Sequence, residues 1–391
     1  MIASRNPMKD RVAIANASTT GFVPHNTERS PASLALEACT AVLRDSGLGA
    51  GDVDGLCGSI PDAPAMQAAL GLPDVTWFAN PVIPFGNHVV AAVAAVASGV
   101  CDVVLAYHAA YRMAWNTASA LRDPFRRALT PGAAPGGGRG PETISGAPAY
   151  AAWASRYMHE YGTPREHLGY VALNDRANAA RNPAAAMRAP MTMDDYLAGR
   201  MVREPLCLYD MDVPVDGADA FVITTAERAR DLPHPPVLVH AATLGMIDRH
   251  DEDQLPSLAR TAQHVVVEAL RARSDLWLDD VDVYFPYDGF TIITLGWLES
   301  TGWCGPGEAG AFLEQHWNEE EGRVLVDGRI PVNPHGGALS EGGTQGSGHL
   351  REAVLQLQGR AGERQVAGAE TALVTPGGFF FNSQGMVLRR G

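Results

Sequence analysis

The side chains that are the best candidates for nucleophilic attack or proton transfer lie in the last third of the sequence. The segment "PYDGFTIITLGWLESTGWCGPGE" contains the phenol of Tyr287, the carboxyl of Asp288 and the thiol of Cys304. A second segment, "NPHGG", adds the imidazole of His335 in a turn where main-chain N–H groups can converge. A thiol can form an acyl-enzyme, whereas a phenol or an imidazole can move protons. The sequence therefore leaves two alternatives, a thiol enzyme and a proton-transfer enzyme.

The cysteines show no pattern of a redox or metal-binding framework. They are odd in number and widely spaced, and no two form a C-x-x-C pair, which argues against disulfides and a zinc site. Each is most simply interpreted as a small buried apolar residue. One of them lies in "STGWCGPGE", which is typical of a helix end and loop. The five are Cys39, Cys57, Cys101, Cys207 and Cys304.

Charge and hydropathy exclude several classes of partner. The chain of 391 residues has 44 acidic and 30 basic side chains and a formal net charge of −14. An acidic protein repels phosphate backbones, so we expect no nucleic-acid partner. No stretch reaches the roughly 18 apolar residues of a membrane span, and the first residues lack the apolar core of a signal peptide. We therefore expect no membrane span and a cytoplasmic location.

Three pieces of sequence recur in the same order. "RVAIANAS" and "PPVLVHAATL" are predicted strands, and each precedes a predicted helix, the first with Ser30 as N-cap and Pro31 at its first position. Each helix leads to a strand preceded by Asp-Val-Asp, at 52–54 and at 280–282. A helix that runs into a strand follows, in "AAVAAVASGVCDVVLAYH" and in "LREAVLQLQGRAGERQVAGAETALVTPGG". This order predicts two duplicated halves of β-α-β type.

Strands separated by long helices predict sheets with helices on their faces. We expect a layered α/β body with an N-terminal half, 1–230, and a C-terminal half, 231–391. Between about 110 and 215 the repeat breaks down into segments rich in Gly, Pro, Met and Arg. We interpret this stretch as an insertion that covers a site and contributes to a dimer interface.

Blocks spread along the chain resemble a known family. They include "VAIANASTTGF", "PLCLYDMDVPVDGADAFVITTAERA", "YDGFTIITLGWLESTGWCGPGEAGAF" and "VNPHGGALSEGGTQGSGHLREAVLQLQG". Together they resemble the thiolase superfamily, and most closely its lipid-transfer-protein or sterol-carrier-protein-x branch, over essentially the full length. The resemblance implies a five-layer αβαβα thiolase fold, a homodimer and an acyl-CoA thioester as substrate. We expect no tightly bound cofactor and no metal.

Two thiolase signatures are altered in this chain. The nucleophilic cysteine of thiolases would fall near Val82, in "ANPVIPFGNHVVAAVAAVASG", where there is no cysteine. The Gly-His-Pro signature is replaced by Gly342-Gly343-Thr344. Valine cannot form an acyl-enzyme, so thioester exchange by the usual route is not expected. An acyl-CoA site without a nucleophile can still stabilise an enolate, and with a β-hydroxyl group this permits retro-aldol cleavage.

"YDGFT", "NPHGG" and "LSEGGTQGSG" resemble the steroid side-chain aldolases of the thiolase superfamily. This resemblance implies cleavage of a β-hydroxy steroid acyl-CoA to a ketosteroid and a short acyl-CoA. It also implies a zinc-ribbon/OB-fold partner protein. Their acid and base are tyrosines, of which one matches Tyr287. The other falls at Ser347 in "TQGSG", a departure that leaves His349 and His335 as further proton carriers. These four residues are the predicted catalytic group.

Two other functions remain open from the sequence alone. One is a thiolase-like acyltransferase that uses another nucleophile, and the other is a non-catalytic acyl-CoA- or lipid-binding subunit. Asp288 is predicted to cap a helix, with orientation of a donor as the alternative. The phosphates of coenzyme A are expected to meet basic residues of the insertion, which the sequence does not identify individually.

Overall fold

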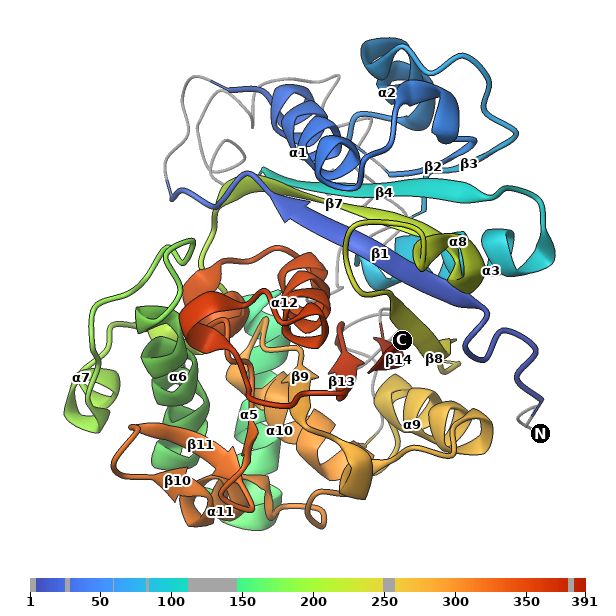
Figure 1. Ribbon diagram of the computed structural model, residues 1–391. Helices are drawn as coiled ribbons and strands as arrows, with labels where there is room; N and C mark the ends of the chain where they lie inside the picture. The colour runs from blue at the N-terminus through green and yellow to red at the C-terminus, as the bar shows by residue number, and fades with distance from the viewer. Residues whose placement is uncertain are drawn as a thin grey trace.

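Nine strands form one mixed sheet that runs through both halves of the chain (Figure 1). In spatial order they are β3 (Trp77–Ala79), β2 (Gly55–Cys57), β4 (Val103–Tyr111), β7 (Asp216–Thr225), β1 (Val12–Thr19), β8 (Val237–Gly245), β14 (Ser383–Arg390), β13 (Thr371–Thr375) and β9 (Val283–Pro286). The computed structural model describes residues 5–24, 29–58, 60–81, 84–111, 146–248, 257–378 and 383–391.

The sheet consists of two sets of strands with the same topology. In the first set, β1 pairs antiparallel with β7, β7 antiparallel with β4, and β4 parallel with β2. In the second set, β8 pairs antiparallel with β14, β14 antiparallel with β13, and β13 parallel with β9. The sets meet at β1 and β8, which share two residue pairs, Ala13 with Leu238 and Ile14 with Val237. The predicted duplication is confirmed.

Two helices, α3 (Gly86–Ser98) and α12 (Ser347–Gln358), lie between the two sets of strands (Figure 1). Helix α3 packs on β4 and β7 of the first set and on β8 and β14 of the second, and α12 also packs on strands of both sets. Their apolar side chains, such as Val93 and Val354, belong to one buried cluster with residues of both sets. The two helices therefore form the central layer of the molecule.

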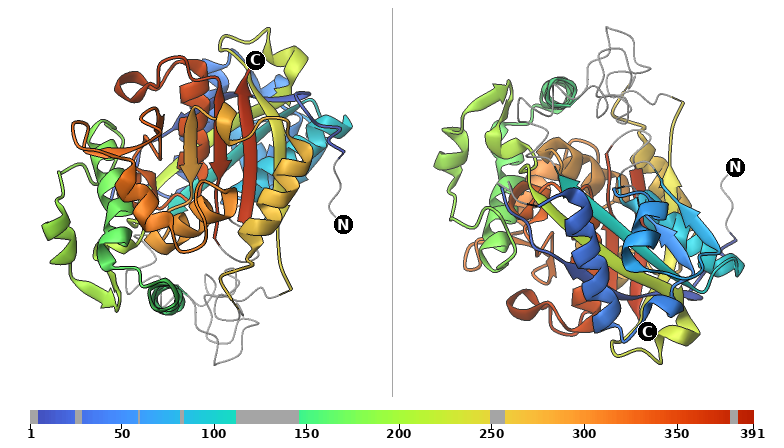
Figure 2. Two further views of the ribbon diagram at one scale, coloured as in Figure 1. Left: turned by 90° about the horizontal axis from the view of Figure 1, so that it is seen from below. Right: turned by 90° about the horizontal axis from the view of Figure 1, so that it is seen from above.

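Further helices cover the outer faces of the two sets of strands. From above, α1 lies over the first set, and from below α9 and α10 lie beside the second (Figure 2). With the central layer this gives the five-layer αβαβα architecture expected of a thiolase fold. The outer helices are α1 (Pro31–Asp45), α2 (Ala63–Leu70) and α8 (Ala226–Ala229) on the first half, and α9 (Ala262–Arg273), α10 (Thr291–Thr301) and α11 (Ala309–Gln315) on the second.

Helix α1 begins as its sequence predicts. The Ser30 hydroxyl accepts the main-chain N–H of Ser33 at 3.1 Å, and Pro31 is the first helical residue. These features stabilise a helix start because the first turn has no internal acceptors for its N–H groups. The buried face repeats with the helical period and consists of Leu34, Ala35, Ala38, Cys39, Val42 and Leu43.

The repeated Asp-Val-Asp has a structural cause. In the first half, the Asp54 carboxylate accepts the main-chain N–H groups of Asp102 and Val103, at the start of β4. In the second half, the Asp282 carboxylate accepts the N–H groups of Glu370 and Thr371, at the start of β13. Each aspartate thus satisfies two donors at the start of the neighbouring parallel strand, which explains why the motif is retained in both halves.

The described part of the insertion packs on the second half, where α6 contacts α10 and α11. Its core joins that of the second half in one cluster. The Gly/Pro-rich part of the insertion, 112–145, lies outside the described residues. The elements are α5 (Ala147–Tyr161), α6 (Arg165–Ala180), α7 (Met193–Leu197), β5 (Met201–Arg203) and β6 (Leu206–Cys207), and nearby lies a small sheet of β10 (Trp317–Asn318), β11 (Arg323–Val326) and β12 (Ile330–Pro331).

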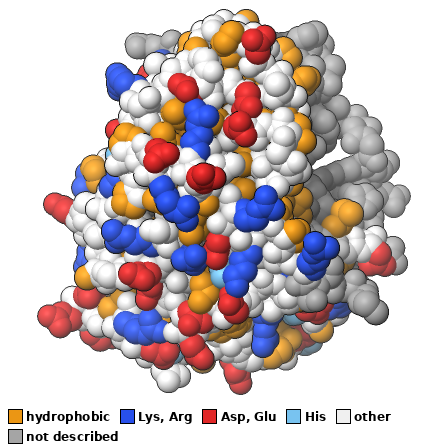
Figure 3. Space-filling model, turned by 45° about the vertical axis from the view of Figure 1, so that its right-hand side comes forward, with side chains coloured by type: hydrophobic (Ala, Val, Ile, Leu, Met, Phe, Trp, Pro, Cys, Tyr) orange, Lys and Arg blue, Asp and Glu red, His pale blue; other side chains and the backbone are white. Residues whose placement is uncertain are grey.

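Acidic and basic side chains are both present over much of the face shown in Figure 3. Among the helices of the described residues, none has both the length and the apolar character needed to cross a bilayer.

Candidate active site

Tyr287 lies where β9 ends and a loop leads into α10. Its main-chain N–H donates to the carbonyl oxygen of Thr375 on β13 at 3.1 Å, one residue beyond the parallel pairing of the two strands. Ligand sites of α/β proteins lie at the carboxyl ends of such strands. The Tyr287 ring packs against Gly289, where an added Cβ would be 2.9 Å from the phenol oxygen. Glycine at this position therefore leaves room for the phenol.

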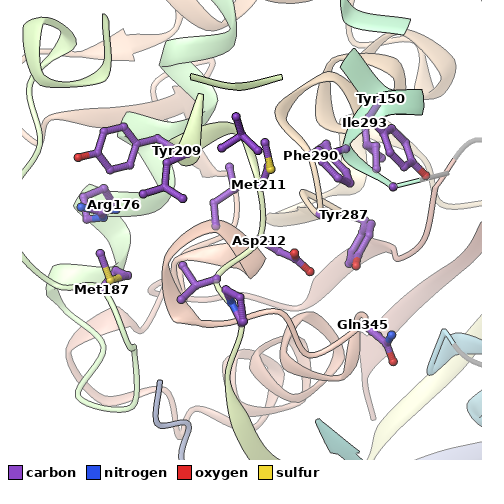
Figure 4. A pocket seen from close by; sticks show the side chains of 18 of the residues that line it. Tyr150, Arg176, Met187, Tyr209, Met211, Asp212, Tyr287, Phe290, Ile293 and Gln345 are labelled. Carbon is purple, nitrogen blue, oxygen red and sulfur yellow. The ribbon is translucent and has the colours of Figure 1, made fainter. Parts of the chain in front are cut away.

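Tyr287 lines a pocket of about 660 Å³ between the insertion and the start of α10. This volume is within the range of small-molecule sites. The rings of Tyr150 and Phe290 stack at 4.2 Å on the same side of the pocket as Tyr287, and Arg176 lies at the opposite end (Figure 4). The rest of the wall is mostly apolar and includes Met187, Arg200, Val202, Leu208, Tyr209, Met211, Asp212, Val213, Pro214, Ile293, Leu339 and Gln345.

His349 lies beside Tyr287, on the first turn of α12. The ring centroids of the two side chains are 5.6 Å apart, and His349 is buried. Its Nε2 is 2.8 Å from Oδ1 of the buried Asp288 carboxylate. A carboxylate that accepts from one ring nitrogen fixes the tautomer and the orientation of an imidazole. The sequence placed Tyr287 and His349 in one catalytic group, and the structure brings them together.

Asp288 has a second set of donors. Its oxygens accept the main-chain N–H groups of Ala338 at 2.8 Å and Leu339 at 2.9 Å. These groups begin the π-helical turn Gly337–Glu341. Asp288 therefore caps this turn, whereas the residue at the N-cap of α10 is Phe290, which makes no side-chain capping bond. Capping and orientation of a donor were alternatives in the sequence, and in the structure the one carboxylate does both.

A second carboxyl group, Asp175 of α6, lies next to Asp288 and is fully buried. Burial and the neighbouring Asp288 charge raise the pKa of Asp175 well above its usual value. Burial opposes ionisation of Asp288 too, but hydrogen bonds from His349, from Asp175 and from the Ala338 N–H hold the pKa of Asp288 below its usual value. Both shifts favour ionisation of Asp288 over ionisation of Asp175.

His335 is buried next to His349, with the two ring centroids 4.8 Å apart and the rings nearly perpendicular. Burial, together with the charges of His349 and nearby arginines, lowers the pKa of His335 well below its usual value, so the ring is neutral. Neither ring nitrogen has a hydrogen-bond partner among the described residues. Its Nε2 is 4.0 Å from the Glu341 carboxylate. His335 adjoins the group but does not line the pocket.

Ser347 faces a different set of partners. Its hydroxyl donates to Oδ2 of the buried Asp219 at 2.6 Å, and Arg351 donates to the other oxygen of Asp219 at 2.7 Å. Arg351 also donates to Glu341, which in turn accepts from Asn182 at 2.7 Å. Ser347 thus belongs to a buried ionic network beside the Tyr287 group.

The cysteines lack the environment of an activated thiol. Burial raises the pKa of Cys57, Cys101 and Cys304 to about 12 and that of Cys207 to about 11, and it also raises the pKa of Cys39. Four are buried, as expected, and Cys304 is half-buried. Val82, the position of the thiolase nucleophile, lies outside the described residues.

Sequence reasoning missed Asp175 and most of the pocket wall. Asp175 lies in "ALNDRANAA", a helix whose buried face includes Asn174, Arg176 and Asn178 as well. A run of buried polar residues on one helix was the available signal, because such groups need internal partners. In the described chain, no group of three or more His, Cys, Asp or Glu side chains is arranged to hold a metal ion.

Comparisons with known proteins identify similar sequences. Residues 246–390 match the family model "Thiolase C-terminal domain-like". The chain is 36% identical to 17-hydroxy-3-oxo-4-pregnene-20-carboxyl-CoA lyase of Mycobacterium tuberculosis, over 95% of this chain and 97% of that protein. It is 34% identical to the steroid side-chain-cleaving aldolase of Thermomonospora curvata, over 93% of this chain and 94% of that protein.

Two solved structures are similar over nearly the whole chain. The structure described as "Ltp2-ChsH2(DUF35) aldolase" has a TM-score of 0.83 and 32% identity, and covers 98% of each chain. A monomeric SCP2-thiolase-like protein from Mycobacterium smegmatis has a TM-score of 0.68 and 19% identity, and covers 100% of this chain and 78% of that one. The second likeness concerns the fold alone.

Proposed function

Because the chain belongs to the thiolase superfamily, in the branch of the steroid side-chain-cleaving aldolases, we propose that it cleaves a β-hydroxy steroid acyl-CoA by a retro-aldol reaction. A base removes the proton of the β-hydroxyl group, and the Cα–Cβ bond breaks as the new carbonyl group forms. The released electron pair enters the thioester as an enolate, which an acid then protonates at the α-carbon. The products are a ketosteroid and a short acyl-CoA, with no net oxidation.

The observation that carries this proposal is the position of Tyr287. Its side chain lines the pocket and adjoins His349, which Asp288 holds in place. A phenol can give a proton to an enolate without any shift of its pKa from about 10. We assign this acid role to Tyr287 and propose His349 as the second proton carrier. The Ser347 hydroxyl donates a hydrogen bond to Asp219, so we propose that it supports the site and does not itself transfer a proton.

The pocket wall suits a large apolar substrate with an anionic carrier. Tyr150, Phe290 and Met211 offer apolar surface to a steroid ring system. Two arginines of the insertion also line the pocket. Arg176 is buried and donates to the hydroxyl of Ser340, whereas Arg200 is exposed. We therefore propose Arg200 as a contact for a phosphate of coenzyme A.

The experiment that tests the function is product analysis of the purified chain with a β-hydroxy steroid acyl-CoA. The name of one similar structure pairs an aldolase with a DUF35 component. We therefore expect full activity only with a zinc-ribbon/OB-fold partner of that type. The expected result is a ketosteroid and a short acyl-CoA in equal amounts. Acyl transfer to an added thiol, without cleavage, would instead indicate an acyltransferase. Binding without turnover in the presence of the partner would indicate a non-catalytic subunit.

Cys304→Ala should leave turnover within about twofold of the wild type, because no thiol in the chain has a lowered pKa. The measurement is kcat for cleavage in the partnered complex. Cys207→Ala is the matched control, since it removes another thiol of raised pKa that does not line the pocket. Loss of turnover in a folded Cys304→Ala protein alone would contradict the lyase mechanism and favour a thiol nucleophile.

We propose that the chain forms a homodimer in solution. The support is the outer strand β3, which among the described strands pairs on one side only, with β2. Phe78 at its centre is 57% exposed, and an exposed edge strand is a template for pairing with a second copy. Light scattering should give twice the mass of the chain, and Phe78→Lys should shift the protein towards monomer. A monomer at micromolar concentration would contradict this assembly.

A further inference from the structure

The insertion places a carboxyl group beside Asp288. Asp175 is carried by α6, yet its Oδ2 and that of Asp288 both lie against Gly337. A Cβ at Gly337 would be 2.8 Å from Asp175 Oδ2 and 2.1 Å from Asp288 Oδ2. Gly337 also has a φ of +59°, a backbone conformation that glycine adopts without strain. The absence of a side chain there allows the two carboxyl groups to approach each other.

The donors around the two carboxyl groups decide which one carries the proton. Asp288 accepts from two main-chain N–H groups and from His349. Asp175 accepts from Asn174 through Oδ1 at 3.1 Å, and its Oδ2 has no donor among the described residues. Two adjacent buried carboxylates cannot both stay ionised. The anion is better stabilised on Asp288, and a proton on Asp175 gives its Oδ2 an acceptor.

We propose that Asp175 is a positioning residue whose protonated carboxyl group donates to Asp288 and thereby holds the Asp288 carboxylate against His349. The chain of contacts runs from α6 through Asp175, Asp288 and His349 to Tyr287. It ties the insertion, which forms part of the pocket wall, to the group proposed to move protons. Its effect on turnover rests on the proposed function, whereas its effect on stability does not.

The first arm of the test compares two substitutions by turnover in the partnered complex. Asp175→Asn keeps a donor, since the amide N–H replaces the O–H, and kcat should stay within about threefold of the wild type. Asp175→Ala removes the donor, and kcat should fall by about 10-fold or more with little change in KM. Asn178→Ala is the matched control, because it removes a buried bond from the same helix to the Val332 carbonyl without touching Asp288. Equal losses in all three variants would overturn the proposal.

The second arm measures thermal unfolding against pH and needs no substrate. The pKa of Asp175 is raised by folding, so the native state keeps a proton that the unfolded chain releases above about pH 4. Wild-type stability should therefore fall relative to Asp175→Asn as pH rises above about 4. The other ionisable groups around the pair are common to both proteins, so their effects largely cancel in the difference; they are Tyr287, His335, His349, Glu341, Arg351 and Arg176.

The two arms separate failure of this proposal from failure of the proposed function. A stability difference that widens with pH supports a protonated Asp175 even if no steroid acyl-CoA is cleaved. A difference that moves in the opposite direction would show that Asp175 is ionised in the native protein and would overturn the proposal. If Asp175→Ala does not fold, the comparison of Asp175→Asn with the wild type still decides the outcome.

Discussion

Tyr287→Phe should lower kcat for retro-aldol cleavage by about 10²–10⁴, the usual contribution of a positioned acid or base. The substitution removes one oxygen and keeps the ring, which packs against Gly289 and lies 5.6 Å from the ring of His349. Fold and substrate affinity should therefore change little. The measurement is kcat and KM in the partnered complex, with a melting curve to show that the fold is retained.

Tyr284→Phe is the control for this experiment. It makes the same chemical change three residues earlier on β9, at a fully buried tyrosine that does not line the pocket. Its hydroxyl accepts a long hydrogen bond from Thr375, at 3.4 Å. Turnover of this variant should match the wild type. If Tyr287→Phe also stays within about threefold, Tyr287 is a packing residue and the proton is moved by His335, His349 or water.

Asp288→Asn should lower kcat by about 10²–10⁴ and also destabilise the fold. The amide has one acceptor oxygen in place of two, so one of the N–H groups of Ala338 and Leu339 would face another donor. A buried donor left without an acceptor costs about 1–3 kcal/mol. The same change removes the charge that holds His349. Turnover and the free energy of unfolding are the two measurements.

Asp54→Asn separates the two effects of that substitution. Asp54 also accepts two main-chain N–H groups, at the start of β4, and does not line the pocket. It should show the loss of stability without the loss of turnover. If Asp288→Asn lost stability alone and kept its kcat, Asp288 would be a cap for the turn Gly337–Glu341 and nothing more.

The fold was largely predictable because its signals are local and repeated. In both copies of the Asp-Val-Asp motif, the last aspartate accepts two main-chain N–H groups at the start of the neighbouring strand. These aspartates are Asp54 and Asp282. The start of α1 was predictable because Ser30 and Pro31 act within one turn of the helix. Tyr287 could be proposed as a candidate because it follows a strand in a segment that resembles a known family.

The rest of the candidate site depends on contacts between distant segments. Asp175 and Asp288 are far apart in sequence, and only tertiary packing brings a carboxyl group of α6 against one that follows β9. The opposite shifts of their pKa values depend on that approach and on burial, which no local pattern encodes. The Ser347 hydroxyl donates to Asp219 because β7, which carries Asp219, lies beside the first turn of α12. This contact also joins distant segments of the chain.

The position of α3 and α12 between the two sets of strands bears on how the protein folds. Each helix buries apolar side chains against strands of both halves, so neither half encloses a complete core by itself. A fragment limited to 231–391 would leave one face of α12 without its partners from β1 and β7. We therefore expect that neither half folds on its own, because each would expose apolar surface that the other half covers.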